Sequence, residues 1–182
     1  MPRGDASAER IRAAALDLFS RHGVAGTSLQ MIADALGVTK AAVYYHFRTK
    51  DEIVRAVLAP AFATFATLLD DVAAHPEPER AALLVDGLAR QAVTHRNLYA
   101  VVLQDVTAAE LRRQSPGDVD TFRRLRETLA GPLPDDISRT RAAIFLSGLM
   151  GPAVDADVAR LDDVTLERAV AGAGRRLLGL PD

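Results

Sequence analysis

One segment of this chain, residues 28–50 (SLQMIADALGVTKAAVYYHFRTK), leaves little freedom in how it can fold. Its first half predicts a short helix with a single buried apolar stripe, formed by Leu29, Ile32, Ala33 and Leu36. Gly37 supplies the C-terminal stop of that helix, and Thr39 supplies an N-cap for the next one. Just upstream, Thr27 and Gln30 have the spacing of a capping box that starts the first helix. Two short helices joined by a tight turn are therefore expected here.

The second helix of this pair is too short to be stable alone, and its side chains divide into two faces. Val43 and Phe47 form the natural inward pair at positions i and i+4. The outward face carries Lys40, Ala41, Tyr44, Tyr45 and His46. A short helix that is polar and aromatic at its surface, and braced by another helix, has the geometry of a helix-turn-helix reading the major groove of DNA.

The remainder of the chain also follows helical spacing, and no strand pattern interrupts it. Turns rich in glycine and proline separate helices predicted at about residues 7–21, 49–74, 78–95, 97–105, 107–113 and 118–130, one from about 136 that bends or divides at 151–152, and one from 162 or 163 to about 178. Pro60 lies inside the 49–74 helix, where it should kink or interrupt it. The expected fold is all-α, with a three-helix head in residues 1–50 joined by a linking helix to a helical-bundle body within residues 51–182.

Charge is distributed unevenly along the chain. The net charge of −2 alone would argue against a nucleic-acid binder. Residues 1–50, however, hold seven Lys and Arg against four Asp and Glu, a net +3, while the remaining residues carry −5. The only two lysines, Lys40 and Lys50, both lie in or next to the helix pair. A basic head on an acidic body can orient a protein on a polyanion.

Missing residue types narrow the functional classes. The 182 residues include no cysteine, which removes thiolate chemistry and zinc fingers and fits a reducing cytoplasm. No apolar run approaches the roughly 20 residues of a membrane span, and the N-terminus lacks the apolar stretch of a secretory signal. We therefore expect a cytoplasmic protein with no membrane partner.

The sequence motifs give little support to an enzymatic function. There is no glycine-rich phosphate loop, and no two of the four histidines stand four residues apart on a helix. The acidic pairs at 70–71, 135–136 and 162–163 are adjacent, so on a helix their carboxylates point apart and serve as solvated or capping charges. We expect no catalytic residues, no metal site and no cofactor.

Residues 7–55 resemble the TetR (tetracycline-repressor-like) family of bacterial transcriptional regulators. The resemblance rests on the order and spacing of five short motifs, FSRHG at 19–23, GTS at 26–28, IADALGV at 32–38, TKAAVYYHF at 39–47 and KDE at 50–52. It implies a homodimer whose two heads read the half-sites of a palindromic operator in double-stranded DNA. It also implies that the body combines dimerisation with a pocket for a small-molecule effector, whose binding releases the DNA.

The residues expected to contact DNA are those exposed on the second helix and those at helix starts: Thr27, Ser28, Thr39, Lys40, Ala41, Tyr44, Tyr45, His46 and Lys50. Tyrosine hydroxyls suit phosphate oxygens, and their ring edges suit thymine methyl groups. Lys40 starts the reading helix, where guanine is a plausible target. Helix N-termini bind phosphate through their amide groups, although helix capping alone would also explain Thr27, Ser28 and Thr39.

In the body, two further sets of residues follow from the resemblance. The expected effector pocket is formed by Leu84, Leu88, Gln91, His95, Tyr99, Leu103, Phe122 and Leu125, and ordinary core packing is the alternative for each of them. The expected dimer interface is formed by Ile144, Ser147, Gly148, Gly151, Leu166, Val170, Gly172, Ala173 and Leu177. Small residues within helices suit close packing against another helix, either across a two-fold interface or inside one subunit.

Two other functions remain open. The chain could be a helical ligand-binding protein whose head no longer binds DNA, an alternative that the intact set of outward side chains argues against. It could also be a DNA-binding regulator controlled by a protein partner, without a small-molecule effector.

Overall fold

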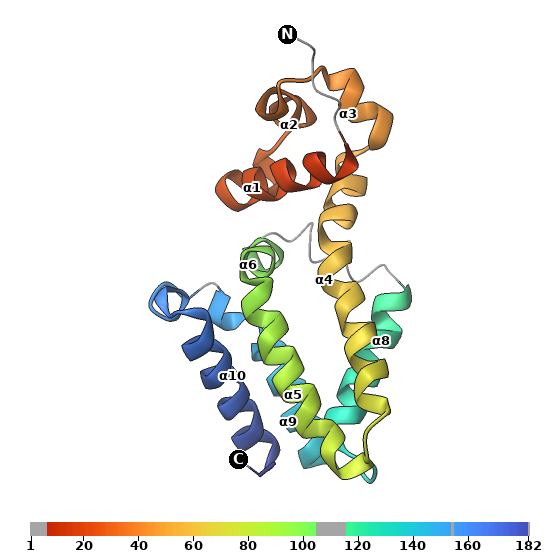
Figure 1. The fold of residues 1–182 in the computed structure, drawn as a ribbon, viewed down its shortest axis with the longest axis vertical. Helices are drawn as coiled ribbons and strands as arrows, with labels where there is room; N and C mark the ends of the chain where they lie inside the picture. The colour runs from red at the N-terminus through yellow and green to blue at the C-terminus, as the bar shows by residue number, and fades with distance from the viewer. Residues whose placement is uncertain (1–6, 105–115, 154, 182) are drawn as a thin grey trace. The chain divides into compact units, whose positions relative to one another are not determined.

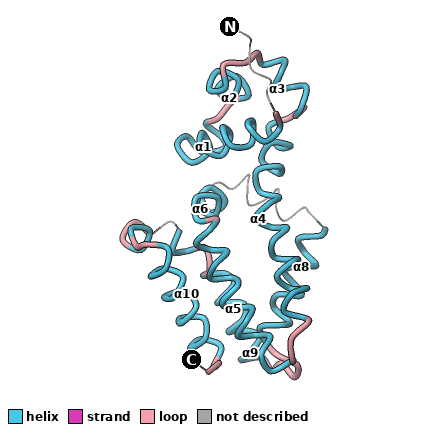
Figure 2. The backbone as a smooth tube through the Cα atoms, viewed as in Figure 1, coloured by secondary structure: helices cyan, strands magenta, loops and turns pink. Residues whose placement is uncertain are grey.

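The computed structural model describes residues 7–104, 116–153 and 155–181, and every regular element in these ranges is helical (Figures 1 and 2). The predicted all-α fold is confirmed. The chain divides into two compact units, one comprising Met1–Pro60 with a segment that starts at Ala100, the other Ala61–Tyr99 and Pro116–Asp182. The short helix predicted at 107–113 lies outside the described residues.

The head contains α1 (Ala8–Gly26), α2 (Leu29–Leu36), α3 (Lys40–His46) and the first part of α4 (Lys50–Ala73). Its core is built from apolar side chains that are almost fully inaccessible, namely Ile11, Ala15, Phe19, Ile32, Val43 and Ile53. We expected the first helix to stop at His22–Gly23, and helical geometry is interrupted there, because Gly23 has φ 70° and ψ 165°. A further helical turn beyond this kink carries α1 to Gly26.

The turn between α2 and α3 follows the sequence pattern closely. Gly37 ends α2 in the left-handed conformation, at φ 66°, and the Thr39 hydroxyl accepts the amide hydrogen of Ala42 at 3.2 Å to cap α3. The start of α2 differs from our prediction, because the cap is Ser28, whose hydroxyl accepts from the Met31 amide at 3.2 Å. The predicted capping box of Thr27 with Gln30 was therefore wrong by one residue.

The helix α4 runs through Pro60 without interruption. By length and hydropathy alone it is the described helix that could cross a membrane. Its apolar residues are nevertheless taken up by packing inside the protein, where Ile53, Val54, Val57, Leu58, Ala61, Phe62, Phe65, Leu69 and Val72 are buried. This burial is typical of a core helix.

The second unit also contains α5 (Glu77–Thr94), the start of α6 (Arg96–Gln104), α8 (Pro116–Ala130), α9 (Asp136–Gly148) and α10 (Asp163–Leu178). Two 3-10 turns, η1 (Gly151–Ala153) and η2 (Val158–Arg160), follow α9, so the division expected at Gly151–Pro152 is present. The helix α10 packs on α5 and α9, and α8 packs on α5 and α9. This arrangement encloses a core that includes Leu84, Val85, Leu88, Leu125 and Leu166.

Candidate nucleic-acid interface

The reading helix α3 has an inward face and an outward face. Val43 is completely buried, whereas the outward residues Lys40, Ala41, Tyr44, Tyr45 and His46 are exposed. Exposure is greatest at Tyr45, with 79% of its surface accessible, and reaches 37% at Tyr44. Both rings are therefore accessible to a partner on the outward face of α3. The two-faced character predicted for this helix is therefore present.

The outward side chains form two neighbouring pairs. The Lys40 ammonium lies 5.5 Å from the centroid of the Tyr44 ring, within the range of a cation–π contact. The Tyr45 and His46 rings lie edge to face with centroids 5.1 Å apart. A cation, two phenols and an imidazole on one short helix offer donors for phosphate oxygens and for base edges. All four side chains keep their polar atoms on the outside of the head.

The residues at helix starts separate into exposed and buried ones. Ser28 and Thr39 are exposed, and each hydroxyl accepts from its own helix while keeping one hydrogen to donate. Thr27 is only 2% exposed, and its hydroxyl donates to the Gly23 carbonyl at 2.8 Å. The structure thus removes the Thr27 side chain from the predicted set of DNA contacts, because it faces the interior of the head.

Lys50 also makes contacts that the sequence did not predict. Its ammonium donates to the Val24 carbonyl at 2.8 Å and to the Thr27 carbonyl at 3.2 Å, and it lies 3.5 Å from the Ala25 carbonyl. The Lys50 ammonium is therefore directed at backbone carbonyls of the head. Its contact with a DNA phosphate stays a prediction.

Comparison with known proteins identifies the family to which the head belongs. Residues 11–57 match the sequence profile of the bacterial regulatory proteins of the tetR family. Residues 11–57, the head of the chain, therefore belong to the TetR family of bacterial regulatory proteins. A 51-residue stretch is 49% identical to SrpR, an HTH-type transcriptional regulator of Pseudomonas putida, covering 28% of this chain and 24% of SrpR. A 95-residue stretch is 28% identical to the HTH-type transcriptional repressor KstR2 of Mycolicibacterium smegmatis, covering 50% of this chain and 45% of KstR2.

The two curated relatives are thus matched over less than half of their length. The similarity of the fold covers more of the chain than the similarity of the sequence. The solved structure of the transcriptional regulator FadR from Bacillus subtilis, in complex with stearoyl-CoA, superposes with a TM-score of 0.69 at 17% identity, covering 92% of this chain and 97% of that one. The chain therefore combines a helix-turn-helix head with a helical C-terminal domain whose fold is similar to that of FadR.

The predicted effector residues lie in or around the core of the second unit. Leu84, Leu88, Tyr99 and Leu125 are fully buried, whereas Gln91, His95 and Phe122 are half-buried. The Leu103 side chain lies outside the described part. Sequence reasoning missed the contribution of α4, which places the rings of Phe62 and Phe65 against Phe122, with centroids 6.2 and 5.8 Å from that of Phe122. It also missed Thr64, whose hydroxyl donates to the Gln91 side-chain oxygen at 3.0 Å. The i, i+3 spacing of the two phenylalanines was the available signal.

Tyr99 stands out within this set. Its hydroxyl is buried, and nothing in the described part of the chain hydrogen-bonds to it. Burial raises the pKa of the Tyr99 phenol, so the group stays protonated and keeps a hydrogen to donate. Burial also lowers the pKa of the neighbouring His95, whose ring centroid lies 6.4 Å from that of Tyr99. Both groups are therefore neutral at pH 7.

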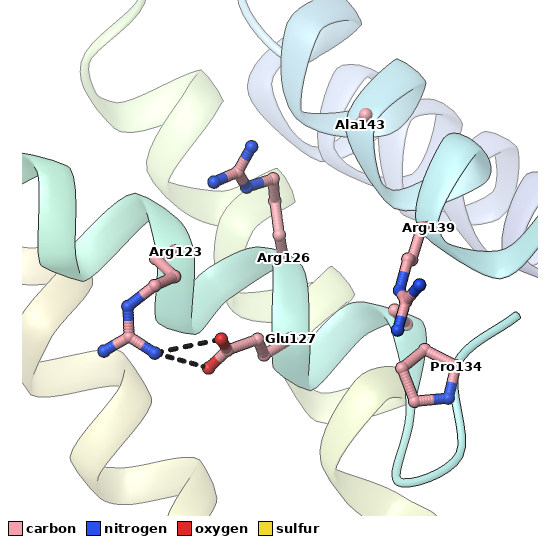
Figure 3. A pocket seen from close by; sticks show the side chains of 7 residues that line it. Arg123, Arg126, Glu127, Pro134, Arg139 and Ala143 are labelled. Atoms are coloured by element: carbon pink, nitrogen blue, oxygen red, sulfur yellow. Dashed lines mark hydrogen bonds and ion pairs between the residues drawn. The ribbon is translucent and has the colours of Figure 1, made fainter. Parts of the chain in front are cut away.

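A separate surface pocket of about 240 Å³ lies between α8 and α9 (Figure 3). It is lined by Arg123, Arg126, Glu127, Ala130, Pro134, Arg139 and Ala143, none of which belongs to the predicted effector set. Arg123 is paired with both Asp120 and Glu127, and the latter pair is drawn with dashed lines in Figure 3. The charged residues of this lining are three arginines and one glutamate, whereas the predicted effector set consists mainly of leucines and aromatic residues.

The predicted dimer residues divide between the surface and the interior of the protomer. Ile144 is 53% exposed, and Ser147, Gly148 and Ala173 are exposed, while Gly151, Gly172 and Leu177 are half-buried. Leu166 and Val170 are buried in the protomer's own core. Two large apolar residues that the sequence did not single out, Ile137 on α9 and Val164 on α10, are 61% and 65% exposed. An uncovered apolar surface thus exists on both helices.

Proposed function

We propose that this transcriptional regulator is a homodimeric repressor that binds a palindromic operator through its helix-turn-helix and is released by a small apolar or amphipathic effector. The single observation that best supports DNA binding is the exposed face of α3, which is formed by Lys40, Tyr44, Tyr45 and His46. The exposed hydroxyl caps Ser28 and Thr39 add phosphate-binding groups at two helix starts. We infer that DNA is bound in the bacterial cytoplasm.

Dimerisation is supported by the apolar side chains that α9 and α10 leave uncovered. Ile137 and Ile144 lie one heptad apart on α9, and Val164 lies near the start of α10. Helix faces of this kind are stable in water when a second apolar surface covers them, and a two-fold pairing lets the same patch serve both subunits. A dimer would also match the symmetry of an operator with two half-sites.

Effector control is supported by the chemistry around Tyr99. A buried hydroxyl without a partner costs about 1–3 kcal/mol, and a ligand that accepts its hydrogen bond would recover that cost. The surrounding leucines and phenylalanines suit an apolar ligand body, and Gln91 and His95 add polar groups. FadR, which shares the fold, holds stearoyl-CoA. We propose an effector with an apolar body and at least one hydrogen-bond acceptor.

Replacing Tyr45 by Phe tests the DNA interface. The duplex probe is the sequence that the wild-type chain itself selects from a random pool of duplexes. Tyr45→Phe should lower the affinity for this probe about tenfold, because a hydrogen bond to a charged phosphate contributes about 1.5–3 kcal/mol. Stability should not change, because the Tyr45 side chain is mostly in solvent. Binding is followed by fluorescence anisotropy and stability by urea unfolding.

Tyr99→Phe is the matched control, since it removes the same hydroxyl from the core of the second unit. DNA affinity should stay at the wild-type value, and stability should not fall because the lost hydroxyl has no partner in the described part of the chain. If both variants bind the selected duplex equally, the Tyr45 hydroxyl makes no contact with DNA. If the wild-type chain selects no duplex, the DNA-binding proposal fails. The helical ligand-binding protein would then be the better explanation.

A further inference from the structure

The ammonium of Lys50 meets the turn between α1 and α2 from a position more than twenty residues along the chain. Its three contacts are the carbonyls of Val24, Ala25 and Thr27, at 2.8, 3.5 and 3.2 Å. Lys50 is itself the first residue of α4. One side chain therefore links the end of α1 to the start of α4, and we name this set of contacts the Lys50 clasp.

Such a group suits the end of α1. The carbonyls in the last turn of a helix have no partner among the amides of the same helix, and the Val24 carbonyl, which accepts from the Thr27 amide at 3.3 Å, keeps a second lone pair for a cation. Helices commonly satisfy these carbonyls with a basic residue in the last turn, but α1 has none there. Lys50 supplies that cation from outside the helix.

The clasp encloses the helix-turn-helix itself. Residues 28–49, which include all of α2 and α3, lie in the loop that it closes. The α3–α4 turn within this loop is fixed by two further bonds, from the Glu52 amide to the Thr49 hydroxyl at 3.1 Å and from the Arg48 amide to the Glu52 carboxylate at 2.7 Å. The α2 cap on Ser28 comes directly after the clasped carbonyls. The orientation of α3 thus depends on both ends of this loop.

The chain's other lysine has a different environment. Lys40 is exposed at the start of α3, and its contact in the described structure is with the face of the Tyr44 ring. From this contrast we propose that Lys50 is a positioning residue that holds α3 in its reading orientation, while Lys40 contacts the DNA directly. The inference rests on the proposed DNA-binding function. It assigns to Lys50 a role that requires no contact with phosphate.

The first test compares Lys50→Met with Lys40→Met, two variants that keep the apolar stem and remove the charge. The probes are the duplex selected by the wild-type chain and a random duplex of the same length. Lys40→Met should reduce the slope of log affinity against log salt by about one unit, because one ion pair with DNA is lost. Lys50→Met should leave the slope unchanged, lower affinity for the selected duplex about tenfold, and reduce discrimination between the two probes. Lys50→Arg, which keeps the donors, should recover part of that discrimination.

A fall of about one unit in the salt slope of Lys50→Met would make Lys50 a phosphate ligand and overturn the proposal. Unchanged discrimination in a folded Lys50→Met variant would overturn it as well. Helicity by circular dichroism at the assay temperature separates loss of orientation from loss of fold.

The second test needs neither DNA nor a variant. Trace acetylation of the wild-type chain, read peptide by peptide by mass spectrometry, compares its two lysines directly. Lys50 should react about tenfold more slowly than Lys40 in the folded chain, and the two should react equally in denaturant. Equal rates in the folded chain would overturn the clasp. If the wild-type chain selects no duplex, the proposed function fails, and this measurement still decides whether the clasp exists.

Discussion

The head and the body cap their helices with different chemistry. In the head, hydroxyl groups of Ser7, Ser28, Thr39 and Thr49 accept the amide hydrogens at the starts of α1 to α4. In the body, α9 and α10 are capped instead by the carboxylates of Asp135 and Asp162, at 2.7 and 3.0 Å from the amides of Ser138 and Thr165. Serine, threonine and aspartate are all good N-caps, so helix stability alone does not explain this division.

The proposed DNA-binding function of the head gives a reason for this difference between hydroxyl and carboxylate caps. A carboxylate at a helix start interacts favourably with the helix dipole, and at the body it adds to a surface that is already acidic. The same carboxylate beside α3 would repel the phosphates of DNA. Hydroxyl caps stabilise the helix without adding negative charge, in the region whose first 50 residues carry a net +3. If the head binds DNA as proposed, hydroxyl caps at these helix starts keep further negative charge away from the duplex.

The largest expected effect comes from exchanging the two kinds of cap. Thr39→Asp should keep α3 folded, because aspartate caps at least as well as threonine. It should nevertheless lower affinity for the selected duplex by at least about hundredfold, since like charges brought together at an interface cost several kcal/mol. Anisotropy titrations measure the affinity, and circular dichroism confirms the fold.

The reverse exchange is the control. Asp162→Ser at the start of α10 replaces an acid by a hydroxyl in the body and should leave DNA affinity unchanged. If Thr39→Asp binds DNA as the wild type does, then the start of α3 does not approach the duplex, and charge does not explain the division of caps.

The next largest effect concerns how the body is packed. Gly174 of α10 is buried against α5 and α9, where an added Cβ would come within 2.5 Å of the Phe145 ring and 2.9 Å of Val85. Gly174→Leu should therefore destabilise the chain by about 3 kcal/mol through overpacking. For a chain of this length that corresponds to a fall in Tm of roughly 6–12 °C. Calorimetry or thermal circular dichroism measures it.

Gly172 provides the matched position two residues earlier. A Cβ there would approach no more than the tip of the Arg176 side chain, at 3.4 Å. Gly172→Leu should change protomer stability by less than about 1 kcal/mol, while sedimentation velocity should show loss of the proposed dimer. Equal destabilisation by the two variants would mean that α10 does not pack as described. A Gly172→Leu dimer would place the interface elsewhere.

In the head, sequence signals between neighbouring residues predicted the helices and the turn but not the longer-range contacts. Periodicity and the Gly37 and Thr39 signals predicted α2, the turn and α3, because each depends on residues a few positions apart. Thr27 and Ser28 are adjacent capping residues, and only the path of the chain decides which of them caps α2. The contacts of the Lys50 clasp could not be predicted from the sequence, for a different reason. Nothing local indicates that the Lys50 ammonium meets carbonyls more than twenty residues away.

In the body, the pattern of apolar residues predicted helices but not their partners. The sequence grouped Ile144 with Leu166 and Val170 as one interface, whereas Ile144 is exposed and the other two are buried in the protomer. A helical stripe shows that a face is covered, and it does not show by which element. The same limit applied to α4, whose Phe62 and Phe65 meet Phe122 through an arrangement set by tertiary packing.

The smallest expected effect again separates the two kinds of cap, this time by pH. The amide and hydroxyl of Ser138 hold the pKa of Asp135 below its ordinary 3.8, and those of Thr165 do the same for Asp162. A carboxylate with a lowered pKa in the folded state contributes stability that is fully present above the unfolded pKa. That contribution is lost as the pH falls through the folded value, and so below 3.8. Acid should therefore remove the cap contribution of the body and leave that of the head intact.

The double variant Asp135→Asn/Asp162→Asn keeps side-chain caps that do not titrate. Its stability relative to the wild type, measured by urea unfolding, should differ by a constant amount at neutral pH, and the difference should shrink below pH 3.8 as the wild-type carboxylates are protonated. Ser28→Asn in the head is the control. It exchanges one neutral cap for another, so its difference from the wild type should not change with pH over the same range. A double variant whose difference stays constant down to pH 2.5 would show that the two carboxylates are not held by the helix starts, and the contrast between head and body would then rest on charge at the DNA face alone.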